Sequence, residues 1–255
     1  MKVDFFKEVK QWDMEIDGSR AMRPVFYYNN FSMTAMYTAT TKQILKYIPH
    51  PDMHPIEMVP GKALVGFTAF EYRDSDIGSY NEFSIAVMIK WGGKSIPGLT
   101  MMNQMISGNF SAYVWHLPVT TEAARFGGVV LYGLPKFIAG VDFRRDDQSV
   151  SCEVSEGKNK ILSFTGRVLK TSPGKISKVK TYSIKDGIPL ATNIHTNQVE
   201  FAKSSDKNSA HIEIGDNHAI CNELKDINLS KNPLFYQYSP VNESILFPAK
   251  NIIDN

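Results

Sequence analysis

The sequence is poor in cysteine and has no marked excess of charge of either sign. Its two cysteines, Cys152 and Cys221, lie far apart and form neither a CxxC motif nor a Cys/His ligand spacing, which argues against a disulfide scaffold or a zinc site. Lysine and arginine number 28 against 26 acidic residues, a net charge of +2. Nucleic acids and anionic membranes require concentrated positive charge. We therefore expect neither as a partner.

Long hydrophobic runs are also missing. The longest strongly apolar stretch, residues 83–89, contains Ser84 and is far shorter than the ~20 residues that a membrane helix needs. The amino-terminal segment alternates charged and apolar residues and lacks the continuous apolar core of a signal peptide. Apolar residues make up 43% and charged residues 21% of the chain, as in soluble globular proteins. We expect a soluble cytoplasmic protein with a single domain over residues 1–255.

What the sequence does contain is mainly strand signal. Residues 63–72, 82–91 and 111–117 are rich in β-branched and aromatic side chains. From residue 137 onward, strand-like stretches alternate with short polar turns, a pattern that predicts antiparallel hairpins. So many strands have to pack as two sheets or close into a barrel to hide their edges. The sequence therefore predicts an α+β fold that is predominantly antiparallel β, a barrel- or cone-like double sheet with a few short flanking helices.

Helical signals are few. Residues 3–12 carry apolar side chains at helical spacing, which predicts one or two amphipathic turns. Threonines at 40–41 are placed to begin a short helix that Pro49 ends. A second threonine pair, at 120–121, precedes a single helical turn that the glycines at 127–128 are expected to end.

Several common catalytic signatures are absent, among them the phosphate-binding GxxxxGK[ST], GxGxxG, GxSxG and HExxH. The informative stretch is 127–137, which reads Gly-Gly-Val-Val-Leu-Tyr-Gly-Leu-Pro-Lys-Phe. It places Lys136 among apolar residues. Burying an ammonium ion is costly, and a lysine that answers this cost by losing its proton becomes a nucleophile. The alternative is a lysine whose stem packs on the sheet while its ammonium reaches water.

This stretch resembles the active-site segment of the acetoacetate decarboxylase family. Residues 37–51, which end in Ile-Pro-His-Pro, are similar to an early helix of that family and its exit. Tyr80-Asn81-Glu82 is similar to a Tyr-x-Glu motif that opens a long strand in the family. The resemblance implies that Lys136 forms a Schiff base with a ketone and that Glu82 is an active-site glutamate that moves a proton. The alternative for Glu82 is an exposed glutamate at the start of a strand.

Other positions depart from the family pattern. Phe137 stands where the family has a second lysine, and Phe67 stands at the position of another pocket glutamate. Asn30 stands where the family has a substrate-facing arginine, for which Arg23 is an unaligned candidate. We expect these four side chains, together with Tyr80, to contact the substrate. Because a carboxylate favours an arginine fork, these changes argue against acetoacetate itself and for a more apolar keto substrate.

The resemblance implies a Schiff-base-forming lyase that decarboxylates a small β-keto acid. The lysine iminium accepts the electrons that departing CO₂ leaves behind, so no metal or cofactor is implied. Because the attacking amine must be neutral, we expect burial to keep Lys136 uncharged. The expected partners are a small keto acid or ketone and further copies of the chain in a homo-oligomer. Two alternatives remain open: an aldolase or dehydratase that uses the same iminium, and a non-catalytic barrel that binds a small ligand.

Overall fold

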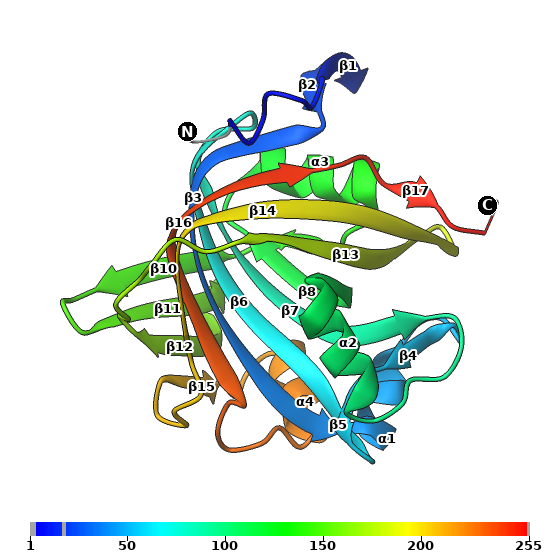
Figure 1. The fold of residues 1–255 in the computed structure, drawn as a ribbon, viewed down its shortest axis with the longest axis vertical. Helices are drawn as coiled ribbons and strands as arrows, with labels where there is room; N and C mark the ends of the chain where they lie inside the picture. The colour runs from blue at the N-terminus through cyan, green and yellow to red at the C-terminus, as the bar shows by residue number, and fades with distance from the viewer. Residues whose placement is uncertain (1–3, 17–18, 254–255) are drawn as a thin grey trace.

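A closed barrel is the centre of the molecule. The computed structural model describes residues 4–16 and 19–253 (Figure 1). Within this part, seven strands pair around a ring in the order β7 (Tyr80–Trp91), β6 (Lys62–Ser75), β3 (Val25–Thr40), β16 (Phe235–Leu246), β14 (Ile188–Ser204), β13 (Ile176–Lys185) and β8 (Asn109–Val119). Pairing of β8 with β7 closes the ring. Neighbouring strands of the ring run antiparallel, except for β13 and β8, which run parallel.

A second sheet packs against the outside of the barrel wall (Figure 1). It consists of the antiparallel strands β10 (Gly140–Arg145), β11 (Ser149–Glu156), β12 (Asn159–Arg167) and β15 (Ala210–Ile214). Its apolar side chains Cys152 and Phe164 join Phe67, Phe83 and Ile85 of the barrel in one buried cluster. Helix α4 (Ala219–Asp226) adds to the same cluster. The largest apolar core of the described chain therefore lies between the two sheets.

Strand alternation gives the barrel wall an apolar outer face and a mixed interior face, on which the apolar Met36, Leu64 and Met88 form a separate cluster. Since successive side chains of a strand point to opposite sides, the residues that pack on the second sheet identify the outer face. The register then assigns to the interior face Glu82 opposite Phe70, and Asn30 and Tyr80 on either side of Tyr72. Hydroxyl groups bond across this face, with 3.0 Å between Thr34 Oγ1 and Thr68 Oγ1. The interior of the barrel thus offers polar groups.

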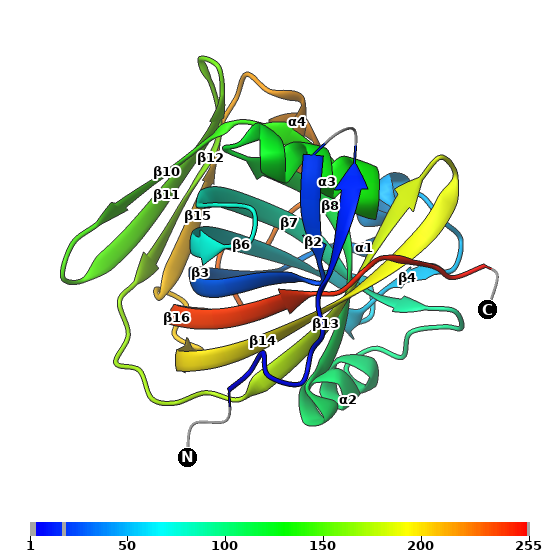
Figure 2. The ribbon, with the colours of Figure 1, turned by 90° about the horizontal axis from the view of Figure 1, so that it is seen from above.

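Short elements surround the barrel. The strands are β1 (Trp12–Ile16), β2 (Ser19–Arg23), β4 (Met53–Pro55), β5 (Glu57–Val59), β9 (Lys136–Ile138) and β17 (Lys250–Asn251). The helices are α1 (Thr41–Ile44), the 3₁₀ turn η1 (Leu45–Tyr47), α2 (Leu99–Ser107) and α3 (Glu122–Tyr132). Seen from above, the β1–β2 hairpin lies beside α3 (Figure 2). No helix in the described part of the chain is long and apolar enough to cross a membrane.

The predicted fold class is confirmed, and so is the short helix that begins after Thr40 and ends before Pro49. The helix predicted over residues 3–12 is wrong for the described residues 4–12, which form a turn followed by the start of β1. Packing against the barrel explains the difference, since the Phe6 ring lies 4.8 Å from that of Phe26. Residue 3 lies outside the described part.

The single helical turn predicted after Thr121 is also wrong, because α3 continues through both glycines to Tyr132. Thr121 caps this helix by accepting a hydrogen bond from the Ala124 amide at 3.4 Å. The helix ends at Gly133, whose φ of 58° is left-handed and suits glycine. Residues 129–132 are therefore helical, and the non-helical residues 133–135 connect them to Lys136.

Candidate active site

Lys136 is positioned by the connection between α3 and β9. After Gly133 ends the helix, Leu134 and Pro135 lead directly into β9, which pairs in parallel with the end of β8. The lysine side chain then runs back along the helix at Gly128. A Cβ added to Gly128 would lie 2.7 Å from Lys136 Cε, so this close approach requires glycine. The side chain of Lys136 is consequently only 5% exposed.

Glu82, near the start of β7, meets this lysine inside the barrel. Lys136 Nζ donates to Glu82 Oε2 at 2.7 Å, and the glutamate side chain is 8% exposed. The alternatives considered from the sequence, a lysine ammonium that reaches water and an exposed glutamate, do not agree with this burial. Buried charges persist when they are paired, and a carboxylate at this distance stabilises an ammonium. The structure thus adds a carboxylate, as a candidate proton acceptor, to the burial of Lys136 that the sequence suggested.

Three tyrosines from neighbouring strands, Tyr27, Tyr72 and Tyr80, surround the ion pair; we call them the tyrosine cluster. Their ring centroids lie 4.4 Å apart for Tyr27 and Tyr72 and 4.6 Å apart for Tyr72 and Tyr80. The Tyr80 ring lies 5.4 Å from Lys136 Nζ, within range of a cation–π contact. Tyr72 donates to Glu82 Oε1 at 3.3 Å, while the hydroxyls of Tyr27 and Tyr80 are 3.2 Å apart.

The tyrosine cluster is uncharged over the pH range in which enzymes work. Burial is the main cause that raises the pKa of each of its three phenols well above the usual value, and the negative charge of Glu82 raises them further. A phenol in this state can donate a hydrogen bond and cannot act as a base. Around the ion pair, these residues therefore supply neutral donors.

Arg23 lies near the same end of the barrel. Its guanidinium carbon is 5.3 Å from the centre of the Tyr132 ring, and Tyr132 is on α3 one helical turn after Gly128, hence on the same helix face. Arg23 Nε is buried and has no hydrogen-bond partner among the described residues. An unpaired buried donor is unusual in a folded protein. Burial raises the pKa of Tyr132 and the charge of the Arg23 guanidinium opposes this shift, so the guanidinium interacts with Tyr132 while its Nε lacks a partner in the described structure.

Asn30 lies on the interior face, opposite Tyr72 in the strand register. Its side-chain amide donates to the carbonyl oxygen of Asn242 and to Ser244 Oγ, both at 3.3 Å. These partners belong to β16, the strand next to β3. Asn30 thus fastens two strands of the wall at the level of the tyrosine cluster.

Phe67 and Phe137 are not brought to the Lys136 amine. Phe67 is three residues from Phe70, the partner of Glu82, so its side chain is on the outer face, where its ring lies 5.6 Å from that of Tyr37. Phe137 follows Lys136 directly and therefore points to the opposite side of β9, where its ring stacks on His218 at 6.5 Å. Strand alternation therefore places both rings away from the Lys136 amine, although the sequence analysis expected them to contact the substrate.

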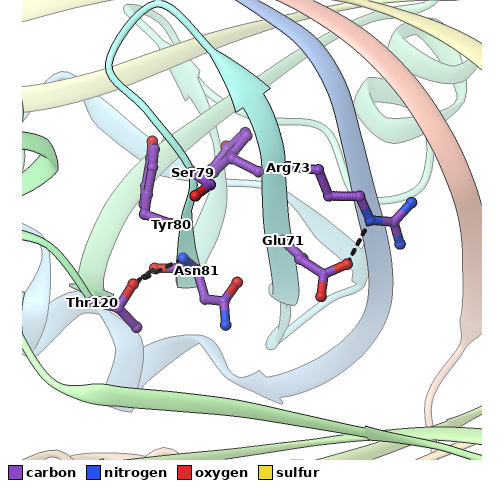
Figure 3. Close-up of a pocket in the computed structure, with 7 residues that line it drawn as sticks. Glu71, Arg73, Ser79, Tyr80, Asn81 and Thr120 are labelled. Carbon is purple, nitrogen blue, oxygen red and sulfur yellow. Dashed lines mark hydrogen bonds and ion pairs between the residues drawn. The ribbon is translucent and has the colours of Figure 1, made fainter.

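An open cavity of about 370 Å³ borders the tyrosine cluster (Figure 3). Its lining consists of Glu71, Tyr72, Arg73, Ser79, Tyr80, Asn81 and Thr120. Hydrogen bonds join the lining residues. Arg73 Nε donates to Glu71 Oε2 at 2.7 Å, and the backbone N–H of Asn81 donates to Thr120 Oγ1 at 2.9 Å. Tyr72 and Tyr80 contact both this cavity and the Lys136–Glu82 pair.

Sequence reasoning missed Tyr27, Tyr72 and Tyr132. Tyr72 pairs with Tyr80 across the hairpin of β6 and β7, so a register prediction for this hairpin would have found it. Tyr27 and Tyr132 come from β3 and α3. Their approach to the site depends on contacts between distant parts of the chain, for which the sequence has no local signal.

The family model described as acetoacetate decarboxylase (ADC) matches residues 14–194. The chain belongs to the acetoacetate decarboxylase family. The match includes Glu82, α3 and Lys136, and it confirms the resemblance inferred from the sequence. A search of curated proteins finds no match.

Solved structures of this family share the fold. Acetoacetate decarboxylase from Legionella pneumophila is 14% identical, with a TM-score of 0.65 over 90% of this chain and 87% of that chain. A second acetoacetate decarboxylase structure is 17% identical, with a TM-score of 0.62 over 90% and 89%. The enduracididine biosynthesis enzyme MppR, complexed with the condensation product of pyruvate and imidazole 4-carboxaldehyde, is 10% identical, with a TM-score of 0.63 over 90% and 89%.

Proposed function

We propose that this protein is a Schiff-base-forming enzyme that decarboxylates a small β-keto acid, with Lys136 as the nucleophile. The observation that carries the proposal is the buried pair of Lys136 and Glu82, 2.7 Å apart. A lysine amine next to a group that can take its proton is the arrangement that nucleophilic catalysis by lysine requires. Acetoacetate decarboxylases are themselves a well-known example of enzymes with an activated lysine nucleophile.

Glu82 supports the proton transfers of Schiff-base formation. As a carbonyl compound enters, the proton of the Lys136 ammonium moves to Glu82, the neutral amine attacks the carbonyl carbon, and a proton passes from the attacking nitrogen to the new alkoxide to give the carbinolamine. Glu82 then returns the proton to the hydroxyl of the carbinolamine, which leaves as water. The products are an iminium ion, one water molecule and the carboxylate of Glu82, so charge and protons balance.

The iminium nitrogen accepts the electrons of the bond that breaks. In a β-keto acid, the bond between the carboxylate and the α-carbon supplies this electron pair, CO₂ departs and an enamine forms. The enamine carbon takes up a proton, and water releases the ketone from Lys136. Arg23, with its unpartnered buried Nε, is suited to hold the substrate carboxylate before it leaves.

Trapping with borohydride tests the proposal. We expect at least one member of a panel of β-keto acids, from acetoacetate to more apolar homologues, followed by borohydride, to add the mass of the reduced ketone to Lys136, with release of CO₂. The adduct should be lost in Lys136→Ala. The matched control is Lys185→Ala, because Lys185 also contacts α3, through a hydrogen bond of 2.6 Å to the Val130 carbonyl, without a carboxylate partner there.

The other outcomes decide between the remaining functions. An adduct with pyruvate or another ketone but no CO₂ from any β-keto acid would favour an aldolase or dehydratase. This second candidate is supported by MppR, whose similarity to this chain is about that of the decarboxylases. If no carbonyl compound forms an adduct, the protein is a non-catalytic binding barrel.

A Glu82→Gln variant tests the proton transfers separately. The amide keeps the shape of the side chain but cannot accept the proton of Lys136. Because general acid–base catalysis contributes about 10²- to 10⁴-fold, we expect turnover to fall by roughly this factor while the Schiff base can still be trapped at long incubation. Unchanged turnover would rule out the proposed role of Glu82.

A further inference from the structure

Glu82 uses its two carboxylate oxygens on two different partners. Oε2 accepts from Lys136 Nζ at 2.7 Å, and Oε1 accepts from the Tyr72 hydroxyl at 3.3 Å. Hydroxyl hydrogen bonds usually measure about 2.7–2.8 Å, so the bond from Tyr72 is the weaker of the two. The carboxylate nevertheless bridges an amine on one side and a neutral phenol on the other.

Tyr72 is held in place by stacked rings. Its centroid lies 4.4 Å from that of Tyr27, 4.6 Å from that of Tyr80 and 5.5 Å from that of Phe70, the last at an interplanar angle of 9°. These contacts come from β3, β6 and β7. Since the ring is packed on several sides, its hydroxyl is kept near Glu82.

The charged and titratable groups around Glu82 come from six elements. In the described structure they are Lys136 of β9, Tyr27 of β3, Tyr72 of β6, Tyr80 of β7 and Tyr132 of α3, with Arg23 of β2 beyond Tyr132. The phenols stay protonated because burial raises the pKa of each of them. The proton on the 2.7 Å contact between Lys136 Nζ and Glu82 Oε2 therefore lies among neutral phenols.

We propose that Tyr72 is a positioning residue that keeps Glu82 ionised and thereby keeps the shared proton on Lys136 in the resting enzyme. The proposal deepens the proposed function and rests on the nucleophilic role of Lys136. A donor to a carboxylate oxygen stabilises the ionised form over the acid. Tyr72 therefore sets the fraction of neutral amine without touching the amine itself.

The reactivity of the Lys136 amine tests this role directly. Formaldehyde with cyanoborohydride methylates neutral amines, and peptide mass spectrometry gives the rate at Lys136. In Tyr72→Phe, Glu82 loses a donor, so the shared proton shifts toward the carboxylate and more of the amine is neutral. We expect methylation of Lys136 at pH 7 to be about 3- to 10-fold faster, the size of a weak hydrogen bond to a charged group.

Two comparisons separate this effect from easier access of the reagent. In a Glu82→Gln background no carboxylate remains to respond, so Tyr72→Phe should leave the methylation rate unchanged. Tyr37→Phe is the matched control, because Tyr37 is a buried tyrosine on the outer face of the same wall. Tyr37→Phe should leave the methylation rate of Lys136 the same as in the protein without substitutions.

The results that overturn the proposal are specific. Methylation that is unchanged or slower in Tyr72→Phe contradicts it, as does an acceleration that persists in the Glu82→Gln background. The proposed function fails separately, if no keto acid gives a borohydride adduct on Lys136. A Tyr72 effect on methylation would still establish the proton-positioning role in that case.

Discussion

At the scale of single residues, a missing side chain decides where the catalytic candidate lies. Lys136 can lie along α3 only because Gly128 has no Cβ. Gly127, its neighbour in the same helix, has no atom within 4 Å of the position that a Cβ would occupy. Of these two adjacent glycines, Gly128 is therefore required to make room for Lys136, whereas no steric reason requires a glycine at position 127.

A substitution by alanine distinguishes the two glycines. In Gly128→Ala the new methyl group overlaps Lys136, so we expect the yield of the borohydride adduct to fall at least tenfold. In Gly127→Ala the adduct should be retained, and the free energy of unfolding should rise by about 0.5–1 kcal/mol because alanine favours a helix over glycine. Intact mass and urea denaturation measure both effects. Equal adduct yields in the two variants would contradict this account.

The residues of the site differ in how far the sequence could predict them. Lys136 and Glu82 lie within recognisable segments, and the structure brings them together. Phe67 and Phe137 were placed by position in the family pattern, which does not show to which side of a strand a residue points. Tyr72 reaches Glu82 through the register of a hairpin, which was not worked out from the sequence.

At the scale of elements, α3 borders the site through Gly128 and Tyr132, and its start is set by one threonine. The sequence pattern placed the cap at the threonine pair 120–121, of which Thr121 is the one observed, but ended the helix at the glycines. Glycine lowers helix propensity, and here the packing of Lys136 against Gly128 outweighs that preference. Local propensity therefore located the start of the helix correctly and its end incorrectly.

Removing the cap should loosen α3 from its first turn. Thr121→Ala deletes the hydroxyl that accepts from the Ala124 amide, and we expect a loss of about 1 kcal/mol in the free energy of unfolding. Thr121→Ser keeps the oxygen and should recover most of this loss. Urea denaturation followed by circular dichroism measures the difference. A serine variant as unstable as the alanine variant would show that the cap is not the cause.

At the scale of the whole molecule, the closed barrel depends on pairings that join distant segments. The predicted class of antiparallel sheets and hairpins is correct, and β10, β11 and β12 follow the expected turns. The parallel pairing of β13 with β8 joins residues 178–182 to residues 109–113. No turn or spacing in the sequence encodes such a contact, so closure of the ring could not be derived from local signals.

Burial of the tyrosine cluster should make the folded protein less stable at alkaline pH. The pKa of Tyr27, Tyr72 and Tyr80 is raised in the folded protein, chiefly by burial. Above pH 10 the unfolded chain releases these protons and the folded chain retains them, so unfolding becomes more favourable as pH rises. We expect the free energy of unfolding to fall by about 1.4 kcal/mol per pH unit for each such phenol.

Urea denaturation at pH 9, 10 and 11 measures this dependence. A variant with phenylalanine at all three positions should show a shallower decline than the unmodified protein, since it has three fewer buried phenols. Identical declines for the two proteins would contradict the assignment to this cluster.

The closed ring of strands also governs how molecules travel to Lys136. Each strand of the ring is hydrogen-bonded to a neighbour on both sides, so the backbone leaves no unpaired seam for passage. We therefore expect carbonyl compounds to approach Lys136 along the barrel axis, and small ones to react faster than bulky ones.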